Sequence, residues 1–199
     1  RLGAHGFDNA LVNLGGNLAV SGRHGDRPWR IGVRHPQGDG AIAALEVEGR
    51  MAVVTSGTYE RFRQDGDRRY PHIIDPRTGQ PAMHVVSATV LHPDAARADV
   101  AATALVVAGG RDWPAVARRL GVHEVMLVDE AGRVQLTPGM AAKVDFVAPP
   151  VSVTEYSKQE WEKPMPEPEK PKPKRGRPAK VEKAAPTEPG AKKEEKAEK

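Results

Sequence analysis

The sequence predicts an α+β fold, in which a mainly antiparallel sheet packs with a few helices. The first half of the chain consists of short apolar segments separated by glycine, and several alternate apolar with polar residues. Such alternation is typical of antiparallel strands with one face in a core and the other in water. A later stretch, after Asp94, repeats apolar residues every three or four positions, which indicates helix. From Pro149 onward large apolar residues almost vanish, which marks the end of the folded part.

The chain of 199 residues is long enough for one domain with its own hydrophobic core. We expect this domain to cover residues 1–148, and a disordered tail rich in Pro, Lys and Glu to cover 149–199. The formal net charge is +4, but the basic excess lies mostly in the tail and the body is close to neutral. The basic composition therefore gives no reason to expect a nucleic-acid enzyme.

Candidate strands fill the first half of the domain. The alternation is clearest at Trp29, Ile31 and Val33. We assign half-buried antiparallel strands to Ala10–Leu14, Leu18–Val20, Trp29–Val33, Ala41–Val47 and Ala52–Thr55.

Turn signals organise the middle of the chain. Tyr59–Tyr70 carries the charged sequence Gln64-Asp65-Gly66-Asp67, which predicts a hairpin turn built on Asp-Gly. Pro76-Arg77-Thr78-Gly79 predicts a second turn, because Pro sets φ and Gly accepts positive φ. A strand resumes over Val85–Leu91.

The last part of the domain mixes helices with a closing hairpin. Asp94 is the candidate N-cap of a helix that ends at Gly109-Gly110, and Trp113–Leu120 predicts a further short helix. Strands are expected at Glu124–Val128, Val134–Thr137 and, at an edge, Lys143–Val147.

Several classes of site are excluded by composition. The absence of cysteine rules out disulfides, zinc-thiolate sites, iron–sulfur clusters and cysteine nucleophiles. There is no apolar run of about 18 residues and no signal-peptide pattern. Because the sequence starts without Met, we expect the true N-terminus to lie upstream of Arg1.

Two polar segments follow apolar strands. Gly15-Gly16-Asn17 brings backbone N–H groups without side chains to a strand end, where they suit a phosphate or flavin or simply form a tight turn. Thr55-Ser56-Gly57-Thr58-Tyr59 places hydroxyls and an aromatic ring at the rim of the sheet. These hydroxyls suit the same ligands, or they satisfy only their own backbone.

Two further groups suggest catalysis. His72 stands in a strand-like segment before a forced turn, where it can act as a general base supported by Asp75 or serve only a structural role. Asp99 and Thr103 share one helix face and offer the hard oxygen ligands that magnesium prefers. Alternatively, Asp99 complements the helix dipole and Thr103 bonds back to a carbonyl.

These segments, in this order, resemble the ApbE-type FAD:protein FMN transferases. The resemblance covers residues 9–148 and rests on several motifs that agree in order and spacing. They are Asn13-Leu14-Gly15-Gly16-Asn17, Thr55-Ser56-Gly57-Thr58-Tyr59, His72-Ile73-Ile74-Asp75-Pro76-Arg77-Thr78-Gly79-Gln80-Pro81 and Ala98-Asp99-Val100-Ala101-Ala102-Thr103-Ala104-Leu105, with Trp29–Val33 and Met126–Asp129 fitting between and after them.

The resemblance implies an ApbE-like catalytic domain that transfers FMN from FAD to a threonine or serine hydroxyl and releases AMP, with Mg2+ as cofactor. His72 is then the general base with Asp75 in support, and Asp99 and Thr103 are the metal ligands. The residues that contact FAD are then Gly15, Gly16, Asn17, Thr55, Ser56, Gly57, Tyr59, His72 and Ile73.

The resemblance also implies a partner and a location. The acceptor is a flavoprotein with a Ser/Thr-Gly-Ala-Thr-like sequence, such as an electron-transport subunit, and the location is membrane-anchored and extracytoplasmic in a bacterium. Members of the family carry an N-terminal half with more of the FAD pocket. We therefore expect weak or no activity from this chain by itself.

Other functions stay open beside transfer. Hydrolysis of FAD to FMN and AMP is the same chemistry with water as nucleophile, and an inactive or purely FAD-binding fragment is a further reading. The tail contains one AT-hook-like sequence, Arg175-Gly176-Arg177-Pro178. A single copy in a Lys/Pro-rich tail is better explained as part of a solvated linker, so we do not expect nucleic acid as a partner.

Overall fold

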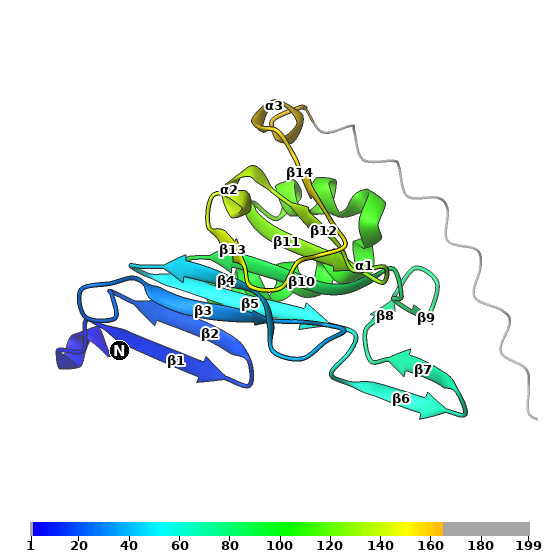
Figure 1. The fold of residues 1–199 in the computed structure, drawn as a ribbon, viewed down its shortest axis with the longest axis horizontal. Helices are drawn as coiled ribbons and strands as arrows, with labels where there is room; N and C mark the ends of the chain where they lie inside the picture. Colours follow the sequence, from blue (N-terminus) through cyan, green and yellow to red (C-terminus); the bar gives the residue numbers. More distant parts are fainter. Residues whose placement is uncertain (1, 165–199) are drawn as a thin grey trace, which may run out of the picture. The chain divides into compact units, whose positions relative to one another are not determined.

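The computed structural model describes residues 2–164, and an antiparallel sheet forms its centre (Figure 1). In these residues the sheet has seven strands, in the order β1-β2-β5-β10-β11-β12-β14. Every neighbouring pair is antiparallel except β12 with β14, which is parallel. The strands are β1 (Ala10–Leu14), β2 (Asn17–Ser21), β5 (Met51–Gly57), β10 (Val85–His92), β11 (Glu124–Asp129), β12 (Arg133–Leu136) and β14 (Ser152–Glu155). The predicted α+β class is confirmed.

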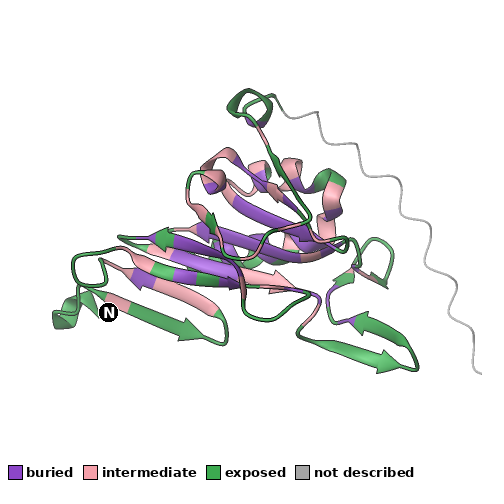
Figure 2. Cartoon of the chain, viewed as in Figure 1, coloured by how far each residue is buried: buried purple, intermediate pink, exposed green. Residues whose placement is uncertain are grey.

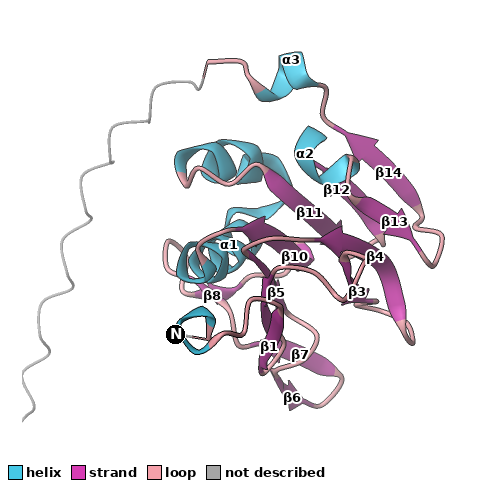
Figure 3. Cartoon of the chain, turned by 90° about the vertical axis from the view of Figure 1, so that its left-hand side faces the viewer, coloured by secondary structure: helices cyan, strands magenta, loops and turns pink. Residues whose placement is uncertain are grey.

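A second sheet and a long helix cover the two faces of the main sheet (Figure 3). The second sheet, in the described part of the chain, has the order β13-β4-β3. Its strands are β3 (Trp29–Arg34), β4 (Ala41–Val47) and β13 (Val144–Phe146). Helix α1 (Ala95–Arg119) lies on the opposite face. The main sheet is therefore the middle layer of three.

The three-layer arrangement produces two hydrophobic cores, one on each side of the central strands. On β5, Ala52 and Val54 belong to the core under α1, whereas Val53 belongs to the core under β3 and β4. Strand β11 divides in the same way, with Val125 and Val128 on opposite sides. The expectation of a half-buried strand at residues 52–55 is therefore corrected: its apolar residues are buried on both faces, as a continuous apolar run indicates.

Helix α1 follows the predicted boundaries. The Asp94 carboxylate accepts hydrogen bonds from the backbone N–H groups of Ala96 and Arg97, so it caps the first turn. At Gly109 the backbone leaves the helical region, with φ 74° and ψ 175°, and helix resumes toward Arg119. The positive φ at this position explains why the interruption occurs at a glycine. The two helices expected from the sequence are thus confirmed as two parts of α1.

Two small hairpins lie beside the sheet. Strands β6 (Phe62–Asp65) and β7 (Arg68–Pro71) pair with each other, as do β8 (Ile74–Asp75) and β9 (Gln80–Pro81). Both predicted turns are present, with Gly66 at φ 57° and with Thr78 and Gly79 donating to the Asp75 carbonyl. The β6–β7 hairpin is exposed along nearly its whole length (Figure 2).

The folded part continues beyond the predicted boundary at residue 148. Strand β14 pairs with β12, and helix α3 (Lys158–Trp161) places the Trp161 ring 5.8 Å from that of Trp113 on α1. Tyr156 completes this aromatic cluster, with its ring 5.4 Å from Trp113. Because a four-residue strand and two isolated aromatics give no periodicity, composition alone assigned residues 149–164 to the tail.

The remaining elements are short. A 3-10 turn η1 (Gly3–His5) precedes β1, and α2 (Pro138–Ala141) follows β12. None of the helices within residues 2–164 is long and apolar enough to cross a membrane. The AT-hook-like sequence at Arg175–Pro178 lies outside the described residues.

Candidate functional site

The polar segments meet where the β1–β2 turn, the end of β5, the start of α1 and the β6–β7 hairpin converge. Two adjoining hollows lie there, and they share Gly15, Thr55, Gly57 and Glu60. We call them the β3 hollow, of about 390 Å³, and the α1 hollow, of about 510 Å³. Together they form one site with two differently lined compartments.

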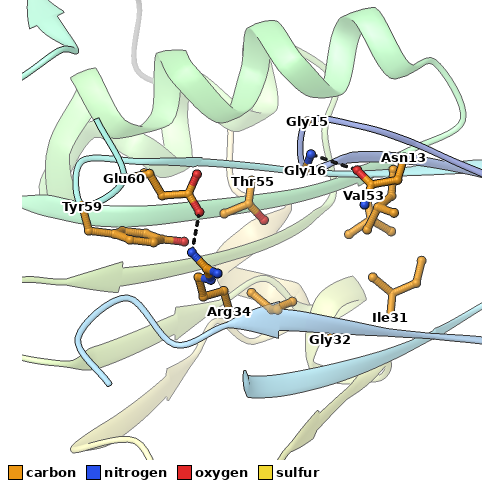
Figure 4. A pocket seen from close by; sticks show the side chains of 13 residues that line it. Asn13, Gly15, Gly16, Ile31, Gly32, Arg34, Val53, Thr55, Tyr59 and Glu60 are labelled. Carbon is orange, nitrogen blue, oxygen red and sulfur yellow. Dashed lines mark hydrogen bonds and ion pairs between the residues drawn. The ribbon is translucent and has the colours of Figure 1, made fainter. Parts of the chain in front are cut away.

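The β3 hollow has a floor of apolar strand residues and, at one end, a polar group formed by Tyr59, Arg34 and Glu60 (Figure 4). The floor comes from β2, β3 and β5, and the Tyr59 ring lies at one end. At that end the Arg34 guanidinium forms an ion pair with the Glu60 carboxylate, with 3.2 Å between nitrogen and oxygen. Its apolar lining consists of Leu18, Ile31, Val33 and Val53. A flat, largely apolar ring system suits this compartment.

The β1–β2 turn closes the site on one side. Gly15 and Gly16 have φ of 62° and 97°, a region that favours glycine, and the Asn13 side chain accepts a hydrogen bond from the Gly16 N–H at 2.9 Å. Asn17 donates from Nδ2 to Oδ1 of Asp99 at 3.0 Å. The two readings from sequence are thus compatible, because the segment is a tight turn and also lines both hollows.

The end of β5 supplies hydroxyl groups between the compartments. The Thr55 and Thr89 hydroxyl oxygens lie 2.9 Å apart, and those of Ser56 and Thr103 also lie 2.9 Å apart. At Gly57 an added Cβ would overlap the Tyr59 ring, so glycine lets this ring fold back over the strand. Partial burial, the largest cause, raises the pKa of the Tyr59 hydroxyl above its usual value, so Tyr59 is neutral at physiological pH.

Asp99 and Thr103 both line the α1 hollow, one helical turn apart on α1. The Asp99 carboxylate and the Thr103 hydroxyl are hard oxygen donors, and Asn17 and Ser56 hold them by hydrogen bonds. This donor set fits magnesium, which takes few protein ligands and completes its shell with waters and phosphate oxygens. Residues 2–164 contain no group of three His, Cys, Asp or Glu side chains arranged for a metal. Within these residues, Asp99 and Thr103 are the side chains that would hold a magnesium ion.

His72 lines the same hollow and is positioned by Arg61. Its Nδ1 lies 3.0 Å from the Arg61 carbonyl oxygen, and its backbone N–H donates to the same oxygen at 3.1 Å. Because a carbonyl only accepts, Nδ1 carries the proton in the neutral ring and Nε2 keeps a free lone pair. Ile73, the next residue, is buried in the core under α1 and also lines the hollow.

The structure does not bring Asp75 to His72, which corrects the supporting role expected from sequence. Among residues 2–164 the carboxylate of Asp75 bonds only to Arg77, with 2.9 Å to Nη2 and 3.0 Å to Nε. These bonds hold the pKa of Asp75 below its usual value. Arg77 in turn donates to the Val107 carbonyl on α1. Asp75 thus fastens the 76–79 turn to α1, and the Arg61 carbonyl orients His72 instead.

Three charged residues of the site were missed from the sequence. All three line the hollows, but Arg34 ends β3 and Glu60 and Arg61 lie in the loop between β5 and β6, where charged residues are ordinary. Their tertiary contacts distinguish them: Arg34 pairs with Glu60, 26 positions away, and the Arg61 carbonyl bonds to His72.

Comparison with known proteins gives one consistent family. The model of the ApbE family matches residues 1–127. The FAD:protein FMN transferase of Rhodobacter capsulatus is 42% identical over 161 residues, which are 79% of this chain and 31% of that protein. The enzyme of the same name from Treponema pallidum is 39% identical over 154 residues, 72% of this chain and 42% of that protein. The chain thus spans a third to two fifths of these relatives.

Solved structures show the same similarity. The ApbE protein of Thermotoga maritima superimposes with a TM-score of 0.62 at 36% identity, over 68% of this chain and 44% of that one. The flavin transferase ApbE of Vibrio cholerae gives a TM-score of 0.60 at 34% identity, over 71% and 46% of the two chains.

Proposed function

This chain belongs to the ApbE family, and on that premise we propose that its site takes part in transferring FMN from FAD to a hydroxyl of an acceptor protein. The acceptor residue is a threonine or serine, and AMP is the second product. The observation that carries the proposal is the meeting of His72 with Asp99, Thr103 and Ser56 in one hollow. A base, hard oxygen ligands and hydroxyl groups in one place are what a magnesium-assisted phosphoryl transfer requires.

The two compartments divide the FAD molecule between them. The apolar floor and the neutral Tyr59 ring of the β3 hollow accept a flat ring, because stacking and burial favour aromatic surfaces. The α1 hollow receives the pyrophosphate beside Asp99 and Thr103. The Gly15 backbone lies where the hollows meet, and an added Cβ there would contact no neighbouring atom, so a phosphate can approach this part of the turn closely.

The residues of the α1 hollow prepare the chemistry before substrate arrives. Magnesium held by Asp99 and Thr103 would neutralise charge on the FAD pyrophosphate. Asn17 and Ser56 fix the carboxylate and hydroxyl that hold it, so these groups need little reorganisation on binding.

His72 removes the proton from the nucleophile. Its Nε2 accepts the proton of the acceptor hydroxyl, while Nδ1 keeps its hydrogen bond to the Arg61 carbonyl. The acceptor oxygen forms a bond to the phosphorus of the FMN half. The bond from this phosphorus to the bridging oxygen breaks, AMP leaves with the electron pair, and the proton on His72 passes to solvent.

Water competes with the acceptor, because the His72 side chain is exposed at the hollow. Attack by water on the same phosphorus gives free FMN and AMP. The same catalytic residues therefore serve hydrolysis when no acceptor is bound.

The test is transfer by the intact protein. FAD, magnesium and a peptide containing Ser-Gly-Ala-Thr are mixed, and mass spectrometry follows the addition of one FMN to the peptide. His72→Ala and Asp99→Ala are expected to abolish the product, whereas His84→Ala, an exposed histidine outside both hollows, keeps it. Transfer that survived both site substitutions would refute the assignment.

A further inference from the structure

The β6–β7 hairpin has two faces, and only one of them leads to His72. In its register Phe62 pairs with Pro71, Arg63 with Tyr70, and Asp65 with Arg68. The ladder continues inward, because the His72 N–H donates to the Arg61 carbonyl. Side chains two apart on a strand share a face. The face that carries His72, here called the His72 face, therefore consists of Arg61, Arg63, Asp65, Arg68, Tyr70 and His72.

The His72 face is basic, because it carries three arginines and one aspartate. No acidic group within residues 2–164 forms an ion pair with Arg61, Arg63 or Arg68. The opposite face differs, since the Arg69 guanidinium lies over the Phe62 ring, 4.7 Å from its centre. Charge on the His72 face is thus presented to solvent.

Exposed aromatic and arginine side chains together are typical of protein-binding surfaces. Tyr70 is 38% exposed beside Arg63, and both strands pair only with each other among the described residues. The hairpin gives little apolar surface to either core, as its exposure shows (Figure 2). The folding of the domain therefore gives no reason for this combination of side chains.

We propose that the His72 face docks the acceptor protein through acidic residues that flank the acceptor hydroxyl. This inference rests on the proposed transfer function and adds the chemistry of its protein substrate. A hydroxyl bound at His72 lies at the inner end of the face, where Arg61 and His72 line the α1 hollow. An extended acceptor segment then runs outward over Arg63 and Tyr70 toward Arg68.

The spacing of the face predicts where the acidic residues lie. Strands rise about 3.3 Å per residue, so Arg63 is about 7 Å and the Asp65–Arg68 pair about 13 Å beyond the Arg61–His72 pair. In an extended acceptor, carboxylates about two and four positions from the reacting hydroxyl come within reach of Arg63 and Arg68. Phosphate groups of FAD are the competing occupant for these arginines, and the experiment separates the two.

Two fluorescein-labelled peptides serve as probes, both with a Ser-Gly-Ala-Thr core. One has Asp and Glu at the flanking positions and the other has Asn and Gln. The intact protein is assayed for FMN transfer to each peptide and for hydrolysis of FAD alone. The charge-reversed variant Arg63→Glu/Arg68→Glu is compared with Arg69→Glu, which reverses one charge on the opposite face of the same hairpin.

We expect the unmodified protein to prefer the acidic peptide by at least about fivefold in KM, because two exposed charge pairs form. Arg63→Glu/Arg68→Glu loses this preference and leaves the KM for FAD in hydrolysis unchanged, and Arg69→Glu keeps the preference. A raised KM for FAD in the double variant would assign the arginines to FAD phosphates and overturn the proposal. An equal loss of the preference in Arg69→Glu would mean that net charge alone causes the effect, and it would also overturn the proposal.

Fluorescence anisotropy of the labelled peptides, without FAD, separates the inference from the proposed function. Tighter binding of the acidic peptide that Arg63→Glu/Arg68→Glu abolishes supports docking even where no FMN is transferred. Transfer with equal binding and equal KM for both peptides refutes docking and leaves the transfer function standing. Unchanged thermal unfolding of the variants shows that the hairpin substitutions leave the domain folded.

Discussion

Strands β5, β10 and β11 are buried on both faces, whereas the β6–β7 hairpin and the β1–β2 turn beside them are largely exposed. The central strands carry the apolar residues of two cores, and they end at the hollows where the exposed segments bring polar groups together. A rigid centre thus positions residues that it does not itself supply. Substitutions in the centre are expected to change stability, and substitutions at the rim to change binding or catalysis.

The largest effect is expected for Leu105→Ala in α1. Leu105 is fully buried in the core between α1 and the main sheet, so its loss leaves a cavity that costs about 4 kcal/mol in the free energy of unfolding. Val100 on the same helix is 62% exposed, and Val100→Ala is the control, with a change below about 0.5 kcal/mol. Chemical denaturation measures both. Similar values for the two variants would show that α1 does not pack as described.

Trp161→Ala tests whether the segment after residue 148 belongs to the rigid centre. Trp161 is 8% exposed, packs with Trp113 and Tyr156, and receives the Arg118 guanidinium near its ring. We expect a loss of about 3 kcal/mol, near the low end for a buried tryptophan because the residue is not fully buried. Denaturation is the measurement. An unchanged denaturation midpoint would mean that residues 149–164 belong to the tail, as composition predicted.

Gly57→Ala is expected to act on the rim alone. The added methyl displaces the Tyr59 ring, which lines the β3 hollow, without entering either core. FAD binding should weaken by about tenfold, or about 1.4 kcal/mol, while the stability changes by less than about 1 kcal/mol. Titration of flavin fluorescence and denaturation give the two values. A large loss of stability with unchanged FAD affinity would contradict the division between centre and rim.

The centre was also the part that sequence predicted best. Asp94 as N-cap and Gly109 as the break in α1 are local signals, because a cap and a positive φ act within a few residues. The two-sided burial of β5 was missed although its continuous apolar run indicates it, because only the tertiary fold shows that β3 and β4 cover its second face. Similarly, Trp161 and Tyr156 gave no periodic pattern, although their packing orders the segment that carries them.

At the rim, the motifs located the residues but not their partners. His72, Asp99 and Thr103 were named from sequence, and the structure places them in one hollow. Their hydrogen-bond partners Arg61, Asn17 and Ser56 come from other elements, so no spacing along the chain indicated these pairings. Asp75 shows the converse. Its nearness to His72 in sequence suggested a contact, but in the structure its carboxylate accepts hydrogen bonds from Arg77 in the following turn.

Asp75→Asn gives the smallest expected effect and tests this last distinction. Because bonding to Arg77 lowers the pKa of Asp75 in the folded protein, its stabilising contribution is present above the unfolded pKa of about 3.9 and is lost as pH falls through the lower folded value. The variant should therefore be slightly less stable than the unmodified protein at neutral pH, and the difference should vanish in acid. Thermal unfolding at several pH values measures it. The pH dependence of FMN transfer should stay unchanged, because Arg61 and not Asp75 orients His72. A shift of the acidic limb of that profile, where the base becomes protonated, would restore Asp75 as the partner of the base.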